Sequence, residues 1–252
     1  MRKSITLVII FFLSVTMLDA DEATTHFING NKAYEAGQFE EAVQYYEYVI
    51  GLKKENWQLY YNLGNAYFRL GVIGKAILNY ERALKLNSEN EDIRFNLELA
   101  ALQTLDRIPE PPKELWLTAL EKWLKAPAFS FLLYTTLAIY ALILCLLAAR
   151  NFFAPIARAG LVKPVLVVAT IFLFVFGGIF SYRWYDQAHN KYGVIIAEEV
   201  SVTSSPASDA TELFILHQGT KFQLREQSDN WMRIRLRDGK SGWINAQTAG
   251  KI

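Results

Sequence analysis

The sequence predicts a multidomain chain of mixed α and β class: an α-helical repeat domain, two transmembrane helices and a small all-β barrel. Three observations support this: a self-similarity with a fixed 34-residue period, two long charge-free stretches, and apolar-polar alternation near the carboxyl end. The chain-wide totals hide this division, because 26 Lys and Arg balance 25 Asp and Glu while 52% of the 252 residues are hydrophobic. The net charge of +1 gives no general electrostatic reason to bind nucleic acid.

Residues 1–20 have the pattern of a secretory signal peptide. A basic start precedes an apolar core from Ile5 to Leu18, and Leu18-Asp19-Ala20 resembles a cleavage site. An uncleaved signal anchor is the alternative. Both interpretations place the residues after 21 on the far side of the membrane.

The two charge-free stretches predict transmembrane helices over residues 129–149 and 164–182. The alternative is a pair of buried helices in a soluble domain. The intervening loop, residues 150–163, carries three basic residues and no acidic residue, which indicates a cytoplasmic loop. Both large flanking domains are then extracytoplasmic, in agreement with the signal peptide.

Residues 112–126 place leucine and tryptophan side chains at helical spacing just before the first predicted span. Trp116 and Trp123 belong to this apolar face. Two interpretations remain open: an amphipathic helix lying on the outer leaflet, or a helix packed on the preceding domain.

The repeat occupies residues 21–110. Residues one period apart match in small and aromatic types that let paired helices approach closely, and Gly71 supplies a turn. A third half-copy precedes a proline-rich stretch that prohibits its second helix. This pattern resembles the tetratricopeptide repeat, and it predicts two repeats plus a capping helix at about residues 92–105. The matched pairs are Gly30 and Gly64, Asn31 and Asn65, Gly37 and Gly71, Ala42 and Ala76, Tyr46 and Tyr80, Glu47 and Glu81, and Leu52 and Leu86.

The resemblance implies a concave surface that holds a peptide or a partner protein; a solvated helix face is the alternative for each residue on it. A carboxylate clamp is not expected, because Phe27 and Asp92 stand where that subset of the family carries lysines. Residues 21–125 hold 12 basic and 16 acidic residues, which weakly favours a basic or mixed-charge partner. The candidate groove residues are Asn31, Tyr34, Tyr61, Asn62, Asn65, Phe68 and Arg69.

The alternation of apolar and polar residues over 190–252 predicts about five short strands, with Asp238-Gly239 as a hairpin turn. The stretches AEEVSVTSSP, HQGTKF and WMRIRLRDGKSGWI resemble a bacterial SH3 domain. Such domains bind peptidoglycan stems in wall hydrolases, so the resemblance implies Trp231 and Trp243 as a candidate ligand surface. Packing in the core or at its rim is the alternative for both tryptophans.

Catalytic chemistry is scarce in the sequence. The three histidines, His26, His189 and His217, lack metal-ligand spacing, and the lone Cys145 lies within a predicted span. We therefore expect no enzymatic activity, no catalytic or metal site and no cofactor.

The order of signal peptide, tetratricopeptide repeats, two spans and bacterial SH3 domain resembles the BatE-like family of the bacterial aerotolerance (Bat) operon, as does NEDIRFNLELA after the second repeat. The resemblance implies a location in the bacterial inner membrane, with both large domains in the periplasm. It also implies a non-enzymatic scaffold in an oxidative or envelope stress complex with von Willebrand-type Bat proteins and a MoxR-type ATPase. The alternative is a cell-wall sensor or accessory subunit whose SH3-like domain binds peptidoglycan.

Overall fold

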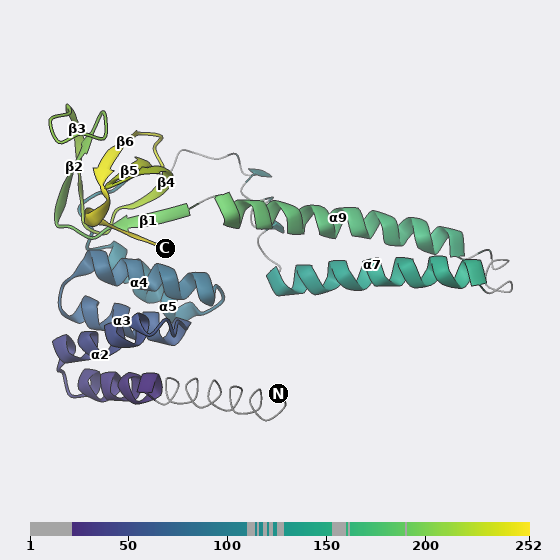
Figure 1. Cartoon of the computed structure of the whole chain (residues 1–252), viewed down its shortest axis with the longest axis horizontal. Helices are drawn as coiled ribbons and strands as arrows, with labels where there is room; N and C mark the ends of the chain where they lie inside the picture. The colour runs from purple at the N-terminus through teal and green to yellow at the C-terminus, as the bar shows by residue number, and fades with distance from the viewer. Residues whose placement is uncertain are drawn as a thin grey trace, which may run out of the picture. The chain divides into compact units, whose positions relative to one another are not determined.

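The computed structural model describes residues 22–109, 114, 116–117, 120, 123–124, 129–152, 160, 162–189 and 191–252. The predicted signal peptide, most of the 112–126 segment and most of the 150–163 loop lie outside the described residues. The chain divides into two compact units. One contains helical repeats and an antiparallel sheet, and the other contains two long apolar helices (Figure 1). The predicted fold class is confirmed.

The helical repeats begin with a helix over residues 22–35 and stack as successive helical pairs. Asn56 and Asn90 cap two of the helices, because their Oδ1 atoms accept the backbone N–H of Leu59 at 2.7 Å and of Ile93 at 3.0 Å. Gly71 adopts a φ of 73° between two helices, a conformation that favours glycine. The labelled helices are α2 (Phe39–Gly51), α3 (Trp57–Arg69), α4 (Ile73–Leu86) and α5 (Glu91–Ala101).

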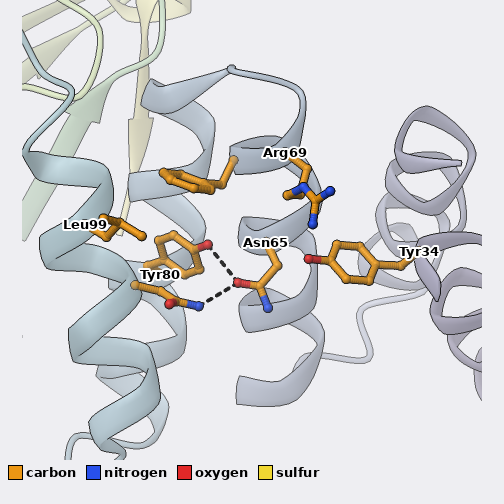
Figure 2. A pocket seen from close by; sticks show the side chains of 7 residues that line it. Tyr34, Asn65, Arg69, Tyr80 and Leu99 are labelled. Atoms are coloured by element: carbon orange, nitrogen blue, oxygen red, sulfur yellow. Dashed lines mark hydrogen bonds between the residues drawn. The ribbon is translucent and has the colours of Figure 1, made fainter. Parts of the chain in front are cut away.

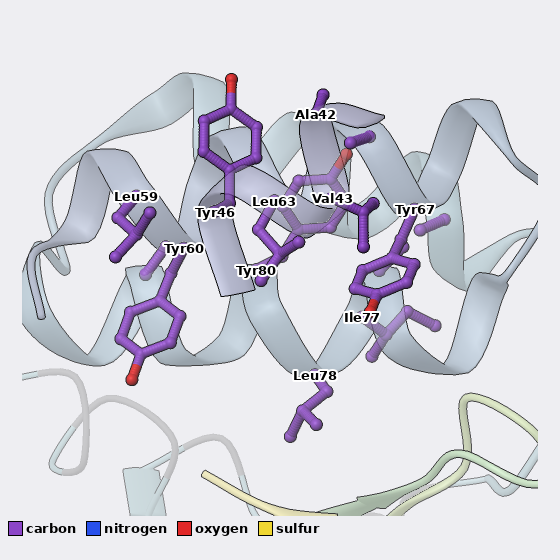
Figure 3. Close-up of a cluster of buried hydrophobic side chains, with 14 of the residues drawn as sticks. Ala42, Val43, Tyr46, Leu59, Tyr60, Leu63, Tyr67, Ile77, Leu78 and Tyr80 are labelled. Atoms are coloured by element: carbon purple, nitrogen blue, oxygen red, sulfur yellow. The ribbon is translucent and has the colours of Figure 1, made fainter. Parts of the chain in front are cut away.

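Buried tyrosines pack among small and aliphatic side chains in the core of the repeats (Figure 3). Tyr46 and Tyr80 are buried, and each lies against a glycine of the preceding helix. A Cβ atom on Gly64 would lie 2.7 Å from the Tyr80 ring, and one on Gly30 would lie 2.6 Å from the Tyr46 ring. These glycines are therefore part of the packing between the two helices of each repeat.

The second unit pairs α7 (Phe129–Phe152) with α9 (Val162–His189), which lie side by side in Figure 1. Near one end of the pair, the ring centroids of Phe129 and Phe180 are 5.0 Å apart. Both helices are long and apolar enough to cross a membrane. Cys145 is exposed on α7.

The carboxyl-terminal domain is one antiparallel sheet of seven strands in the order β3-β2-β6-β5-β4-β1-β7. The sequence predicted about five, because β7 is too short for alternation to be recognised and β1 is buried on consecutive residues. Met232 and Ile234 point into the barrel core, as expected, and Gly239 turns the β5–β6 hairpin with a φ of 95°. The strands are β1 (Lys191–Ile195), β2 (Glu199–Thr203), β3 (Glu212–His217), β4 (Lys221–Ser228), β5 (Trp231–Arg235), β6 (Ser241–Asn245) and β7 (Ala249–Lys251).

The barrel packs directly on the helical repeats within the first unit. Val194 of β1 is fully buried in the hydrophobic core of the repeats rather than in the barrel core. A Cβ atom on Gly250 would lie 2.2 Å from Leu78 of α4, and one on Gly74 would lie 2.7 Å from the Ile195 carbonyl. This close contact between two domains was not predicted from the sequence.

Candidate functional site

A hydrogen-bond network between neighbouring helices of the repeats occurs twice. In the first copy, the Asn31 Oδ1 accepts from the Tyr46 hydroxyl at 2.8 Å and from the Asn62 amide at 2.9 Å. The second copy lies one repeat further along the chain: the Asn65 Oδ1 accepts from Tyr80 at 2.8 Å and from Asn96 at 2.9 Å. Each network fixes one asparagine amide from both sides.

The chemistry of the two tyrosines keeps these networks intact. Burial is the largest cause that raises the pKa of Tyr46 and of Tyr80 above the ordinary value. Both hydroxyls therefore stay protonated and act as donors at neutral pH. The asparagine amides keep one orientation, so the polar groups that face the groove are preorganised.

A cavity of about 100 Å³ opens beside the second network (Figure 2). Tyr34 points across it toward Asn65 and Arg69. The Arg69 guanidinium lies 4.6 Å from the centroid of the Phe39 ring, a cation–π contact that holds the exposed cation at the cavity wall. The lining residues are Tyr34, Asn65, Phe68, Arg69, Tyr80, Asn96 and Leu99.

Four of the seven residues predicted for the groove thus line the cavity, and the other three lie in the hydrogen-bond networks. Asn31 and Asn62 bond to each other, and the Tyr61 hydroxyl accepts from the Asn96 amide at 3.0 Å. The sequence interpretation omitted Tyr80, Asn96 and Leu99. The last two could have been found by carrying the repeat period one step further, onto α5.

The positions that would hold clamp lysines are occupied by groups of other chemistry. Phe27 packs against Tyr46, with ring centroids 6.0 Å apart. Asp92 is an exposed acid in the first turn of α5. Neither residue carries a positive charge that could pair with a terminal carboxylate.

The two tryptophans proposed as a ligand surface lie on the outer face of the β5–β6 hairpin. Trp243 pairs across the ladder with Arg233, and Trp231 pairs with Asn245. Met232, which points the other way, is buried. Both tryptophans are half-buried.

A second polar cluster joins the repeats to the barrel through Asp106. Its Oδ2 accepts from the His217 backbone N–H at 2.7 Å and from the Thr220 hydroxyl at 2.6 Å, and its Oδ1 lies 2.9 Å from His217 Nδ1. Burial alone would raise the pKa of Asp106, but the hydrogen bonds from Thr220 and His217 outweigh burial and hold that pKa below its ordinary value. Asp106 is therefore a carboxylate at neutral pH.

Further contacts link α4 to the barrel. Lys221 Nζ lies 2.7 Å from both carboxylate oxygens of Glu81, and both side chains are largely buried. Arg82 donates to the Lys251 carbonyl at 2.8 and 3.0 Å. Gly74 N–H donates to Gln218 Oε1 at 3.1 Å. Ion pairs and hydrogen bonds thus surround the apolar contact of the two domains.

Metal chemistry has no candidate site in the part of the chain that the structure describes. No group of three or more His, Cys, Asp or Glu side chains gathers there in a way that could hold an ion.

Family models match both the helical repeats and the carboxyl-terminal barrel. A TPR repeat model matches residues 30–71, a tetratricopeptide repeat model matches residues 57–90, and a bacterial SH3 domain model matches residues 199–249. The chain therefore contains TPR repeats and a bacterial SH3 domain. No curated protein matches the chain.

Several solved structures resemble parts of the chain. The Arabidopsis OM64 TPR domain is 22% identical, with 34% of this chain and 70% of that chain covered and a TM-score of 0.33. An NlpC/P60 family protein from Bacillus cereus is 13% identical, with 28% and 23% covered and a TM-score of 0.22, so the match spans less than a quarter of that protein. A T3SS complex from Aeromonas hydrophila is 18% identical, with 68% and 95% covered and a TM-score of 0.33. At these TM-scores none of them bears on function.

Proposed function

We propose that this protein is a non-enzymatic, membrane-anchored scaffold that binds a partner protein in the concave groove of its tetratricopeptide repeats. The observation that carries the proposal is the repeated network of Asn31 and Asn65 beside an open cavity. Recognition of a polypeptide needs hydrogen-bond donors and acceptors, which the asparagine amides and the exposed arginine offer. Because the amides already hold one orientation, their side chains need not be ordered when the ligand binds. TPR and SH3 domains are typically binding modules rather than catalysts, which supports the same assignment.

The test uses the full-length protein in its own membrane. A photoreactive benzoylphenylalanine replaces Phe68 in the cavity wall or, as a matched control, Leu86, an exposed residue at the end of α4. We expect a cross-linked partner from position 68 and not from position 86. The purified partner should then bind the wild type about tenfold more tightly than it binds the Arg69→Glu variant. Equal affinity for wild type and variant would refute the groove as the binding site.

The anchoring part of the proposal rests on the length and apolar character of α7 and α9. We place both helices across a bacterial inner membrane, with residues 150–163 in the cytoplasm and both large domains in the periplasm. The basic loop and the predicted signal peptide support this orientation. A reporter protein fused after residue 155 should be active only in the cytoplasm.

The order of the domains supports a narrower role within this function. We propose that the scaffold serves a Bat-type oxidative or envelope stress complex with von Willebrand-type proteins and a MoxR-type ATPase. Co-purification of the full-length protein from membranes, followed by mass spectrometry, tests this role. Recovery of groove-dependent partners of other classes would refute the Bat assignment and leave the scaffold function intact.

A second candidate function is cell-wall binding, by a sensor or accessory subunit. It is favoured by the bacterial SH3 domain and by the half-exposed rings of Trp231 and Trp243 on one outer face. In this case the full-length protein should co-sediment with isolated peptidoglycan. The Trp231→Ala and Trp243→Ala variants should lose most of that binding, whereas Arg69→Glu should not affect it. Sedimentation that is unchanged by the tryptophan variants would exclude this surface.

A further inference from the structure

The capping helix α5 carries an apolar stripe that faces solvent. We define the α5 stripe as Phe95 and Leu99 of α5 together with Leu102, the C-cap residue directly after it; they are 65%, 40% and 75% exposed. Their spacing of i, i+4 and i+7 places them on one line along the helix. Ile93 and Ala100, on the inner side of the same helix, are fully buried. The stripe is therefore a second apolar face rather than part of the core.

The stripe continues the groove. Phe95, Leu99 and Leu102 lie one repeat period after Tyr61, Asn65 and Phe68, which are groove positions on α3. Leu99 itself lines the cavity that Asn65 and Phe68 line. The groove thus changes character along its length, from amides and phenols on the earlier helices to hydrocarbon on α5.

This change in chemistry decides which backbone conformation fits the stripe. An extended peptide exposes its N–H and C=O groups, and three hydrocarbon side chains cannot replace the water that those groups would lose. An α-helix satisfies its own backbone hydrogen bonds and can present a row of apolar side chains to another helix. A span of seven residues at 1.5 Å per residue is about 10 Å, or two helical turns. A helical ligand is therefore favoured at the stripe.

The charges around the stripe determine which charged residues the ligand should carry beside its apolar row. Glu91, Asp92 and Glu98 are exposed on the same helix and adjoin Phe95 at i−4, i−3 and i+3. The nearby basic side chain, Arg94, donates to the Ser88 carbonyl. A ligand with Lys or Arg beside its apolar row complements these carboxylates, whereas an acidic ligand would be repelled.

We infer that the α5 stripe is a docking surface for an amphipathic helix of the partner protein, with apolar residues at i, i+4 and i+7 and basic residues beside them. The inference rests on the proposed scaffold function and specifies the part of the partner that is bound. The amides near Asn65 remain available for the chain that leads into or out of that helix. Recognition thus combines a polar segment with a helical one.

The test uses full-length protein in phosphatidylcholine nanodiscs and a fluorescent probe peptide. The probe is a side-chain-stapled helix with leucines at i, i+4 and i+7 and lysines on both flanks. Fluorescence anisotropy measures its affinity. We expect Phe95→Ser and Leu102→Ser each to weaken binding about tenfold or more. Leu105→Ser is the matched control, since Leu105 is also 75% exposed but follows Leu102 by three residues and is not part of the stripe, and it should leave the affinity within about twofold.

Further measurements test the charge argument and the identity of the occupant. A probe with glutamates in place of the lysines should bind at least about tenfold more weakly, and equal affinity would refute the charge argument. Binding to empty nanodiscs at the same affinity would mean that the probe senses lipid. Self-association of the probe-free protein that Phe95→Ser abolishes would make a second copy the occupant. Either result overturns the inference. If Phe95→Ser leaves capture of the natural partner by position 68 unchanged, the stripe assignment fails and the proposed scaffold function stands.

Discussion

Replacing Asp106 by alanine is expected to loosen the attachment of the barrel to the helical repeats. The change removes an acceptor that serves the His217 N–H, the His217 ring and the Thr220 hydroxyl. These groups lie in a largely buried cluster, in which the Asp106 side chain is 17% exposed. The loss of hydrogen bonds to a charged group is partly offset by water that can enter, so we expect a cost of about 2 kcal/mol.

The assay is hydrogen exchange of the full-length protein, followed at the peptides that contain His217 and Thr220. A cost of about 2 kcal/mol corresponds to exchange about 30-fold faster, if the local opening governs exchange. Asp209→Ala is the matched control, because Asp209 is an exposed aspartate of the same barrel, and it should leave this exchange unchanged. Exchange in the Asp106→Ala protein within about threefold of the wild type would refute the claim that this carboxylate holds the domains together.

The remaining predictions concern pH, packing and topology. The pKa of Asp106 is lower in the folded state than in the unfolded state, so its stabilisation is fully present above the unfolded pKa of about 4 and is lost as the pH falls through the folded pKa. When the melting temperature is measured against pH, the Asp106→Asn variant should therefore lose less stability in acid than the wild type does. Gly64→Ala should destabilise the repeats by about 1–3 kcal/mol in urea unfolding, because its Cβ would meet Tyr80, whereas Gly51→Ala, which meets nothing within 4 Å, should not destabilise them. A reporter after residue 155 that is active only outside the cytoplasm would contradict the proposed topology.

The helical repeats could be predicted because each decisive feature is local and occurs twice. Gly64 and Tyr80 recur one period after Gly30 and Tyr46, and the structure places each tyrosine ring against its glycine. The same period contained the α5 part of the groove, since Leu99 follows Asn65 by one repeat. The predicted groove residues end at Arg69 and do not include this leucine, which is 40% exposed.

The docking of the barrel on the repeats could not be predicted in this way. Periodicity reports which face of an element is apolar, but it does not report which other domain covers that face. The sequence around Val194 indicates an ordinary residue of a barrel strand, yet Val194 lies in the core of the repeats. Asp106 and His217 are separated by 111 residues, and nothing in their local sequence pairs them. Only folding brings these two side chains together, so no local sequence pattern can predict that they pair.

The barrel and the cavity use different residues of α4. The barrel contacts α4 through Gly74, Leu78 and Glu81, whereas the cavity is lined from α4 by Tyr80. No other residue of α4, which the structure describes in full, lines that cavity, so the barrel and the groove use separate faces of one helix. A partner can then enter the groove while the barrel stays docked, and the free energies of the two events should add. Substitutions on the barrel side of α4 should therefore leave the cavity lining intact, and substitutions at Tyr80 should leave the barrel contacts intact.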